Sequence, residues 1–493
     1  MVFAISGVTR FRKGLTKEHP YGYFVAAQSY LQDIPLIGSL DAIQNLLLVA
    51  RFGVYHHIGT SLWEISRFCM RQCVEHSLHT PPKSPIPPLQ EQLQRRIFWD
   101  CYILDRYSSD VLGRPFAIAD ADISVHLPAN VTDATIIQSP RPSSLCDIET
   151  SGFGEHPELA VFIRCIELRR ITSRIHYEFY VFRHSATGNS GQSTTQNLSA
   201  GHVYVKLHQF LAELENWRQG APFFPEPRCL YERPEWYDFM MEKDKLLVIR
   251  GAMHSAPRRN GQTPEDLLIL CLNSATKIIQ LYSLMLELKC ITWTRNYFQI
   301  IFAAGLCITH CVAMGVHERR GKDNGTMDPV NAISLCSRIL QWFKTEMPDA
   351  GRFSIVFEIL KDNLLGSLPH SNSSEIEDTQ MPQRQQLAAF DARLDPEPLS
   401  QELVGTESRQ SWNQAWVLPG ELTTTNEQGL ATSPMVSSNN VQLQNFAYPF
   451  SLQQQDALDW PTLTDEMMEH LEVGLGEFAW GSMDEIFYTW DVV

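Results

Sequence analysis

Apolar residues recur through most of this chain at spacings of three and four, which is the period of an amphipathic α-helix. Leu46, Leu47, Ala50, Val54 and Ile58 fall at such spacings within a stretch, 21–80, that reads as helical on both sides of a break at 59–61. The same period predicts helices at six further places: 158–183, 202–219, 236–256, 265–289, 293–317 and 328–347. Strand-like alternation of apolar and polar residues is scarce, so the pattern predicts an all-α protein, an irregular multi-helix bundle.

One further helix is predicted in RRIFWDCYILDRYSSDVLGRP, residues 95–115. Ile97, Cys101 and Leu104 share one face of it, so the helix has a broad apolar side. Gly113 fits the position just after a helix end, where a left-handed backbone is common, and Pro115 prevents the helix from continuing.

The charged residues of this helix raise the question of a site. Arg96 and Asp100 are four residues apart, as are Arg106 and Asp110, and this spacing predicts two surface ion pairs of ~0.2–0.5 kcal/mol each.

Asp105 differs, because its neighbours one turn away are Cys101 and Tyr102, and a carboxylate among apolar groups must find a partner. The adjacent turn offers Arg114 and free backbone N–H groups. We therefore predict that Asp105 pins the helix to the turn, with contact to a ligand as the alternative.

The chain divides by composition into four parts. A short N-terminal segment, 1–20, precedes a helical body at 21–368, which contains a polar loop at 185–201. Residues 369–450 are rich in Ser, Thr, Asn and Gln and are predicted to form a disordered linker. In the last part, 451–493, acidic residues alternate with aromatic and aliphatic ones.

The net charge of −16 lies mostly at the C-terminal end. After Arg409 the chain has twelve acidic residues and no Lys or Arg, whereas the first 409 residues hold 40 basic and 44 acidic side chains. The near-neutral body lacks the basic stripe that a phosphate backbone requires, so no nucleic-acid surface is predicted in it. The 11 cysteines are odd in number and scattered, which is typical of a reducing compartment.

Motifs of catalysis and metal binding are missing from the sequence. There is no GxSxG, phosphate-binding glycine loop or HExxH, so we predict that the protein is not an enzyme. The pairs Cys69–Cys73 and Cys307–Cys311 have helical spacing rather than the CxxC spacing of zinc sites, and they are predicted to be core cysteines. The apolar run 300–316 carries His310 and is predicted to be a buried core helix rather than a membrane span.

The 95–128 stretch resembles the signature of the fungal-specific transcription factor domain, the middle regulatory region of fungal zinc binuclear cluster transcription factors. The residues that carry this structural signature are Arg95, Arg96, Phe98, Trp99, Leu104, Asp105, Arg106, Gly113, Arg114, Pro115, Asp122, Ile123, Leu127 and Pro128. Residues that match upstream of it are Gln44, Leu46, Leu47, Leu48, Trp63, Leu78 and His79. The resemblance covers about residues 20–345.

This resemblance implies a nuclear regulator of RNA polymerase II genes, pathway-specific and acting on metabolic or secondary-metabolite genes. In the family a six-cysteine zinc cluster precedes this region and binds DNA, but the first cysteine here is Cys69 and no such cluster occurs. We therefore expect the zinc cluster and the first part of the domain to lie outside this chain. No cofactor is expected within it, and DNA would be reached only through the missing module or a partner. The expected partners are a second copy of the chain, as a homodimer, or a partner transcription factor.

The segment 451–493 resembles an acidic activation segment, whose apolar residues dock in a coactivator groove as a short induced helix. The residues expected to make these contacts are Trp460, Leu463, Met467, Leu471, Phe478, Trp480, Phe487 and Trp490. The alternative for this segment is a terminal helix that packs back on the body, and the two could alternate. For the whole chain, the alternatives are a truncated regulator that titrates partners without binding DNA and a small-molecule-sensing helical domain.

Overall fold

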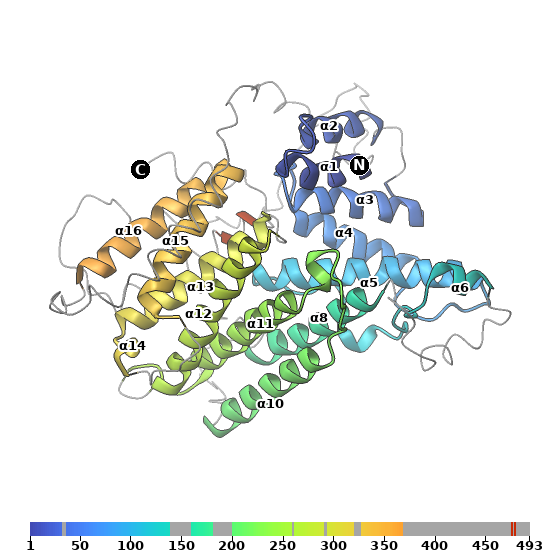
Figure 1. Cartoon of the computed structure of the whole chain (residues 1–493). Coiled ribbons are helices and arrows are strands. Elements are labelled where there is room, and N and C mark those ends of the chain that lie inside the picture. Colours follow the sequence, from blue (N-terminus) through green and yellow to red (C-terminus); the bar gives the residue numbers. More distant parts are fainter. Residues whose placement is uncertain are drawn as a thin grey trace, which may run out of the picture.

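The computed structural model describes residues 1–31, 36–138, 159–180, 200–258, 261–289, 293–319 and 327–367, together with 475, 476, 478 and 479. Every regular element in these ranges is a helix, so the predicted all-α class is confirmed (Figure 1). The predicted linker 369–450 lies outside the described residues. So does the polar loop 185–201, except for its last two residues, which begin a helix.

Five helices form the N-terminal half of the body. They are α1 (Val2–Arg12), α2 (Pro20–Leu31), α3 (Leu40–Gly53), α4 (Leu62–Glu75) and α5 (Pro88–Val111). Their apolar faces meet in one core, in which Phe24 and Phe52 stack with ring centroids 4.6 Å apart. The short helices η1 (Asp120–Asp122) and α6 (Asp133–Gln138) follow α5. Helix α1 lies within the segment 1–20, for which the sequence pattern indicated no helix.

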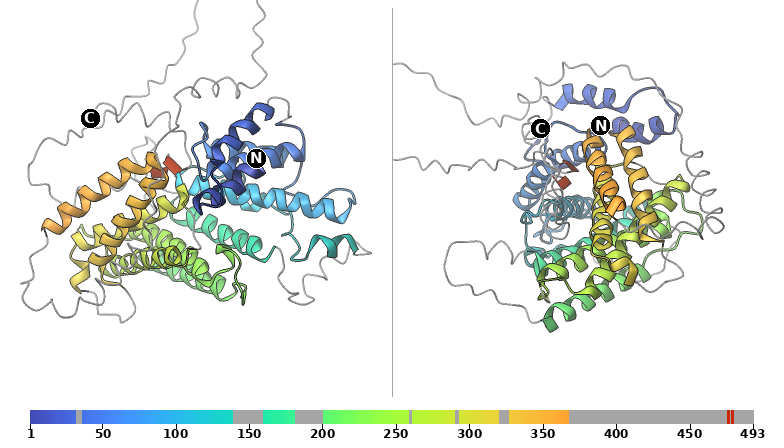
Figure 2. Two further views of the ribbon diagram at one scale, coloured as in Figure 1. Left: turned by 45° about the horizontal axis from the view of Figure 1, so that its top comes forward. Right: turned by 90° about the vertical axis from the view of Figure 1, so that its left-hand side faces the viewer.

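The C-terminal half is larger and has its own core. Its long helices are α8 (Ala160–Phe179), α10 (Ala200–Gln219), α11 (Pro234–Ser255), α12 (Glu265–Glu287), α13 (Arg295–Ala313), α15 (Pro329–Glu346) and α16 (Gly351–Ser367). The short elements are η3 (Leu230–Glu232), α14 (Val316–Arg319) and η4 (Pro348–Ala350). Six of these helices correspond to the predicted ones, while α16 was not predicted. Helix α5 packs on α8 and so connects the halves (Figures 1 and 2).

Local sequence signals explain where several helices begin. Ser39 and Ser61 accept hydrogen bonds from the backbone N–H groups of Ala42 and Glu64, at 3.1 and 3.4 Å, which caps α3 and α4. Prolines occupy the first turn of α5, α11 and α15, where the missing N–H has no intrahelical partner anyway. Helix α3 ends at Gly53, so Val54 and Ile58 lie beyond the helical face that the spacing had predicted for them.

The two halves also meet along a seam, formed by Arg12, Val54 and His56 on one side and by Trp293, Arg295, Glu346 and Asp349 on the other. Arg12 donates a hydrogen bond to the carbonyl of Trp293 and lies 3.4 Å from the Glu346 carboxylate. The Arg295 backbone N–H donates to the Val54 carbonyl at 3.2 Å, and its guanidinium pairs with Asp349. Burial and then the nearby Arg12 guanidinium lower the pKa of His56 to about 3, which keeps this ring neutral.

Helices α12 and α13 are long and apolar enough to cross a membrane by length and composition alone. In the folded chain, 61% of the apolar window of α12 and 78% of that of α13 are buried by the surrounding helices. A core helix of a globular protein has these properties, which agrees with the prediction of a buried helix at 300–316.

Candidate functional site

Helix α5 ends in a turn that closes back on its last carbonyls. Gly113 has φ +60°, its N–H donates to the carbonyl of Asp110 at 3.2 Å, and Arg114 N–H donates to that of Ser109 at 2.9 Å. This is the Schellman arrangement, which requires a left-handed residue after the helix and therefore favours glycine. The sequence-based placement of the helix end at Gly113 is confirmed.

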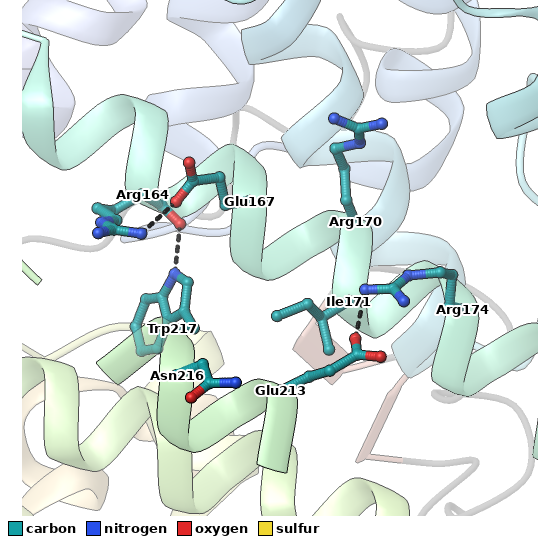
Figure 3. Close-up of a pocket in the computed structure, with 8 residues that line it drawn as sticks. All are labelled: Arg164, Glu167, Arg170, Ile171, Arg174, Glu213, Asn216 and Trp217. Carbon is teal, nitrogen blue, oxygen red and sulfur yellow. Dashed lines mark hydrogen bonds and ion pairs between the residues drawn. The ribbon is translucent and has the colours of Figure 1, made fainter. Parts of the chain in front are cut away.

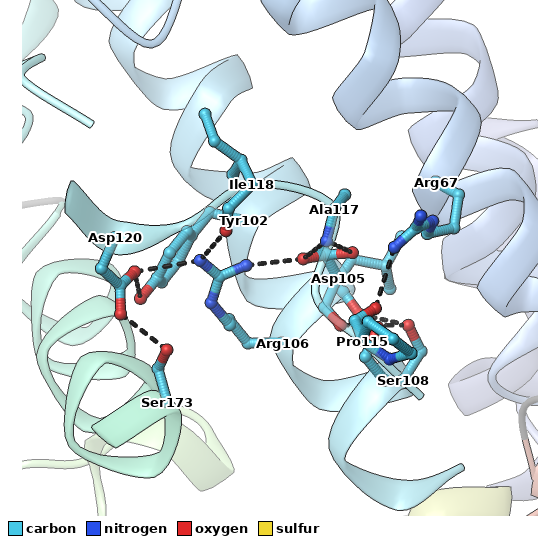
Figure 4. A network of polar contacts seen from close by, with 12 residues as sticks. Arg67, Tyr102, Asp105, Arg106, Ser108, Pro115, Ala117, Ile118, Asp120 and Ser173 are labelled. Atoms are coloured by element: carbon cyan, nitrogen blue, oxygen red, sulfur yellow. Dashed lines mark hydrogen bonds and ion pairs between the residues drawn. The ribbon is translucent and has the colours of Figure 1, made fainter. Parts of the chain in front are cut away.

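Inside this turn lies a buried charge network centred on Arg106 (Figure 4). Its guanidinium pairs with Asp105 at 2.6 Å and with Asp120 at 3.0 Å, and donates to the Ile118 carbonyl at 2.7 Å. The guanidinium also lies over the rings of Tyr102 and Phe116, with its carbon 4.2 and 4.4 Å from their centroids. Both Asp105 and Arg106 are fully buried, so the pair depends on these contacts for its polar partners.

The Asp105 carboxylate also accepts hydrogen bonds from the Ala117 N–H, at 3.2 and 3.1 Å to its two oxygens. It thus connects α5 to the residues after the turn. Burial raises the pKa of Asp105, while Arg106 and the Ala117 N–H act in the opposite direction. The contacts lie at the turn, where sequence reasoning placed them, although the guanidinium that pairs with Asp105 belongs to the adjacent Arg106.

Asp120 extends the network to α8. Its carboxylate accepts hydrogen bonds from Tyr102 at 2.8 Å and from Ser173 at 2.6 Å. Burial favours the neutral carboxyl, but Arg106, Ser173 and Tyr102 outweigh it and lower the pKa of Asp120. The network therefore joins α5, the turn, η1 and α8.

Both predicted ion pairs at four-residue spacing in α5 are wrong. Arg96 pairs with Asp133 at 2.7 Å and Asp100 with Arg51 at 2.5 Å. Arg106 is turned into the network described above. Tertiary packing offers each side chain an opposite charge on another element, and such partners are invisible to spacing along one helix.

Asp110 points to a different helix as well. Its carboxylate lies 3.2 Å from Nδ1 of His176 in α8. Although burial opposes ionisation, the hydrogen bond from His176 and the charges of Lys243 and Arg169 lower the pKa of Asp110.

The other members of the structural signature lie along α5 and its flanks. Arg95 pairs with Glu91 at 2.5 Å and donates to the Leu127 carbonyl at 3.1 Å. Phe98 is fully buried, and Trp99 donates from its indole N–H to the His126 carbonyl at 3.0 Å.

At the turn itself, two arginines flank Trp63. Arg114 lies over the Trp63 ring at 4.4 Å, and Arg67 donates to the Pro115 carbonyl at 2.8 Å. The structure thus places the signature residues in and around one helix-and-turn unit.

A second buried polar cluster was missed by sequence reasoning. Arg169 of α8 pairs with Asp244 of α11 at 3.0 Å, and Lys243 reaches the same carboxylate at 2.9 Å. Both cations face the Tyr107 ring of α5, at 5.0 and 4.9 Å. Burial lowers the pKa of Lys243, and Asp244 opposes the change. The cluster connects the signature helix to the C-terminal half, and no pattern in the sequence indicates it, because its members lie on three separate helices.

Between α8 and α10 lies a cleft of about 460 Å³. Figure 3 shows the side chains that line it: Arg164, Glu167, Arg170, Ile171, Arg174, Glu213, Asn216 and Trp217. Two of its arginines are neutralised, Arg164 by Glu167 and Arg174 by Glu213, both at 2.6 Å. Trp217 donates its indole N–H to the Arg164 carbonyl at 2.9 Å, which fixes the floor of the cleft.

Arg170 differs from the other two arginines. Figure 3 shows its side chain turned away from Glu213 and Trp217. It also lines a second cavity, of about 190 Å³, together with Trp99, Asp120, Ile123, Val125, His126 and Leu127. Within the described part of the chain, no ion-pair partner of Arg170 is found. An exposed cation therefore borders two adjacent cavities.

Of the predicted activation contacts, Phe478 lies within the described residues. It is 2% exposed and packs against Phe298 and Phe353, both with ring centroids 5.3 Å away. The other seven, Trp460, Leu463, Met467, Leu471, Trp480, Phe487 and Trp490, lie outside the described residues.

The cysteine pairs pack as core residues, as predicted. Cys69, Cys73, Cys307 and Cys311 are all buried. Burial raises the pKa of the Cys101 thiol, and Cys69 and Cys73 act in the same direction. Over the residues with described positions, no group of three or more His, Cys, Asp or Glu side chains is arranged to hold a metal ion.

The sequence of this chain is similar to those of several fungal regulatory proteins. The chain is 27% identical over 424 residues to a positive regulator of purine utilization from Emericella nidulans. This alignment covers 72% of this chain and 38% of that protein. It is 22% identical over 372 residues to a putative transcriptional regulatory protein of Schizosaccharomyces pombe, covering 72% and 41%. A negative regulator of pleiotropic drug resistance from Candida glabrata is 28% identical over 238 residues, covering 46% and 20%.

The chain thus spans less than half the length of each of these relatives. No solved structure matches it significantly. The profile of the family described as "Fungal specific transcription factor domain" matches residues 3–219, which include α1 to α5, the buried Arg106 network, α8 and α10. Residues 3–219 of this chain are therefore a fungal specific transcription factor domain.

Proposed function

We propose that this chain regulates transcription by RNA polymerase II in the nucleus, with a helical regulatory body and an acidic tail that recruits coactivators. The match of residues 3–219 to the fungal specific transcription factor domain carries the proposal, and the names of the relatives as regulators support it. Pathway-specific control of metabolic or secondary-metabolite genes fits a relative named for purine utilization. We assign the protein no enzymatic activity.

In this proposal the helical body of the chain does not itself bind DNA. The first 409 residues have a net charge of −4, which leaves no sequence-wide excess of Lys and Arg for a phosphate backbone. A zinc cluster module outside this chain or a partner transcription factor would supply DNA binding. Any zinc would then belong to such a module.

The tail provides the first test. Residues 451–493, fused to an unrelated DNA-binding domain, are expected to raise reporter output well above that of the DNA-binding domain alone, because solvated aromatic residues can dock in a coactivator groove. Replacing Trp460, Trp480, Phe487 and Trp490 with alanine should remove most of this output. The matched control replaces Gln453, Gln454 and Gln455 with alanine and should retain it. Background output from the unaltered tail would contradict the activation role.

A second function, the sensing of a small anionic molecule, is favoured by the position of Arg170. Its side chain lines two adjacent cavities, and the smaller one also has the apolar walls of Trp99, Ile123 and Val125. The Asp120 carboxylate that lines the same cavity is already paired with Arg106. A guanidinium beside apolar walls suits a carboxylate or phosphate on a compact metabolite.

Ligand-dependent stabilisation tests this sensing role. We expect the thermal midpoint of the purified chain to rise with one of a panel of small anions, such as citrate, glutamate or inorganic phosphate. A ligand at 100 times its Kd stabilises the folded state by about 2.7 kcal/mol. Arg170→Ala should abolish the rise, whereas Arg71→Ala, at an exposed arginine of α4, should not. A rise that persists in the Arg170 variant would assign binding to another place.

A further inference from the structure

The seam between the two halves holds a short piece of the acidic tail. Leu475 and Phe478 belong to the core of the C-terminal half, and Ala479 belongs to that of the N-terminal half. All three are at most 2% exposed. Figure 1 shows this red segment beside the N-terminal end of α13. We call the place it occupies the tail groove, lined by Val111, Leu112, Arg295, Phe298 and Phe353.

Arg295 contacts Phe478 in two ways. Its Nη1 donates a hydrogen bond of 2.8 Å to the Phe478 carbonyl, and its guanidinium carbon lies 4.5 Å from the centroid of the Phe478 ring. The ring in turn meets Phe298 and Phe353 edge-on or tilted, at 5.3 Å from each. A cation held over an aromatic face in a water-excluded place, with a charge-assisted hydrogen bond to the backbone, is a specific arrangement rather than general apolar burial.

Gly476 adds a second element of specificity. A Cβ at this position would lie 2.9 Å from the Val111 carbonyl oxygen and 3.4 Å from Leu112 Cδ2. The first distance is shorter than a carbon can approach a fixed backbone oxygen, and α5 ends at Val111. The groove therefore accepts a chain with glycine two residues before the phenylalanine, which the tail provides.

We infer that the tail groove is a docking site for the chain's own segment 475–479, and that docking there excludes binding of the same segment to a coactivator. The second part rests on the proposed activation function. Phe478 cannot be buried against Phe298 and also enter a groove on another protein. The chain positions 368–474 tether the segment to the body, so undocked and docked tails exchange at an effective concentration of up to the millimolar range.

Competition in trans tests the docking itself. A fluorescently labelled peptide of residues 471–485 is titrated with the full chain, either unaltered or carrying Phe478→Ala. The unaltered groove is filled by its own tail, so the peptide should bind the Phe478→Ala chain at least about tenfold more tightly.

Three controls complete this measurement. A peptide carrying Phe478→Ala should bind neither chain, and the chain carrying Phe487→Ala should behave as the unaltered one. Equal affinity for the unaltered and Phe478→Ala chains, or absence of binding to both, would overturn the inference.

A reporter measurement tests the exclusion. In the full chain fused to an unrelated DNA-binding domain, Gly476→Val should release the tail while keeping every aromatic residue. Output should rise by roughly tenfold if the tail is docked nine-tenths of the time. In the isolated tail, 451–493, the same substitution should leave output unchanged, because no groove is present.

Failure of the proposed activation function can be distinguished from failure of the proposed exclusion. An inactive isolated tail would refute the activation function, and the peptide titration would still decide the docking. An active isolated tail, with equal output from the unaltered and Gly476→Val full chains, would refute the exclusion.

Discussion

Arg106→Leu is expected to lower the free energy of unfolding of the chain by about 3–5 kcal/mol, the cost of breaking a buried ion pair by removing one partner. The substitution leaves Asp105 fully buried without its guanidinium and takes away a partner of Asp120. Urea denaturation of the purified full chain, followed by far-UV circular dichroism, measures the change. Arg71→Leu is the matched control, because the Arg71–Glu75 pair is exposed and contributes ~0.2–0.5 kcal/mol.

The double variant Asp105→Leu, Arg106→Leu separates the charge from the packing. Replacing both members of a buried pair by apolar side chains is often neutral, so it should be more stable than Arg106→Leu alone. An Arg106→Leu variant within about 0.5 kcal/mol of the unaltered chain would contradict the structural role of the network.

Phe298→Ala is expected to have a similar effect, about 3–5 kcal/mol, because it empties a site at the centre of an aromatic cluster. The ring is fully buried, and its neighbours Phe343, Phe353 and Phe478 have centroids 5.4, 6.0 and 5.3 Å away. Few atoms around it are free to fill the space, since they belong to separate helices and to the docked tail segment.

The same denaturation measurement tests Phe298→Ala. Phe223→Ala serves as its control, because that side chain is 78% exposed and surface substitutions usually remain within about 0.5 kcal/mol. A loss no larger than that of the control would show that Phe298 is not part of a packed core.

Structural features that depend on residues close together in the sequence were predictable. The end of α5 is an example, because Gly113 and Pro115 determine it within one turn of chain. The helical class and most long helices follow from apolar spacing in the same way. By contrast, α3 ends at Gly53 rather than continuing to Ile58, and α1 and α16 had no signal strong enough to be recognised.

Partner choice was not predictable, since it is decided by packing between distant segments. Spacing predicted that Arg96 pairs with Asp100 and Arg106 with Asp110. In the structure, Arg96 pairs with Asp133, Asp100 with Arg51, and Asp110 with His176. The tail shows the same limit. Phe478 belongs to a segment whose composition is typical of a solvated chain, and its burial follows from Arg295 and Phe298, which lie about 180 residues earlier.

The turn at residues 293–295 contacts three segments that are remote in sequence. Arg12 of α1 binds the Trp293 carbonyl, the Arg295 N–H binds the Val54 carbonyl, and the Arg295 side chain binds the Phe478 carbonyl. Coupling between two binding contacts is reciprocal. If the docked tail strengthens the Arg12–Trp293 contact by some factor, that contact strengthens docking of the tail by the same factor. If the two contacts are coupled, a partner that binds α1 is expected to change the occupancy of the tail groove without contacting the segment 475–479.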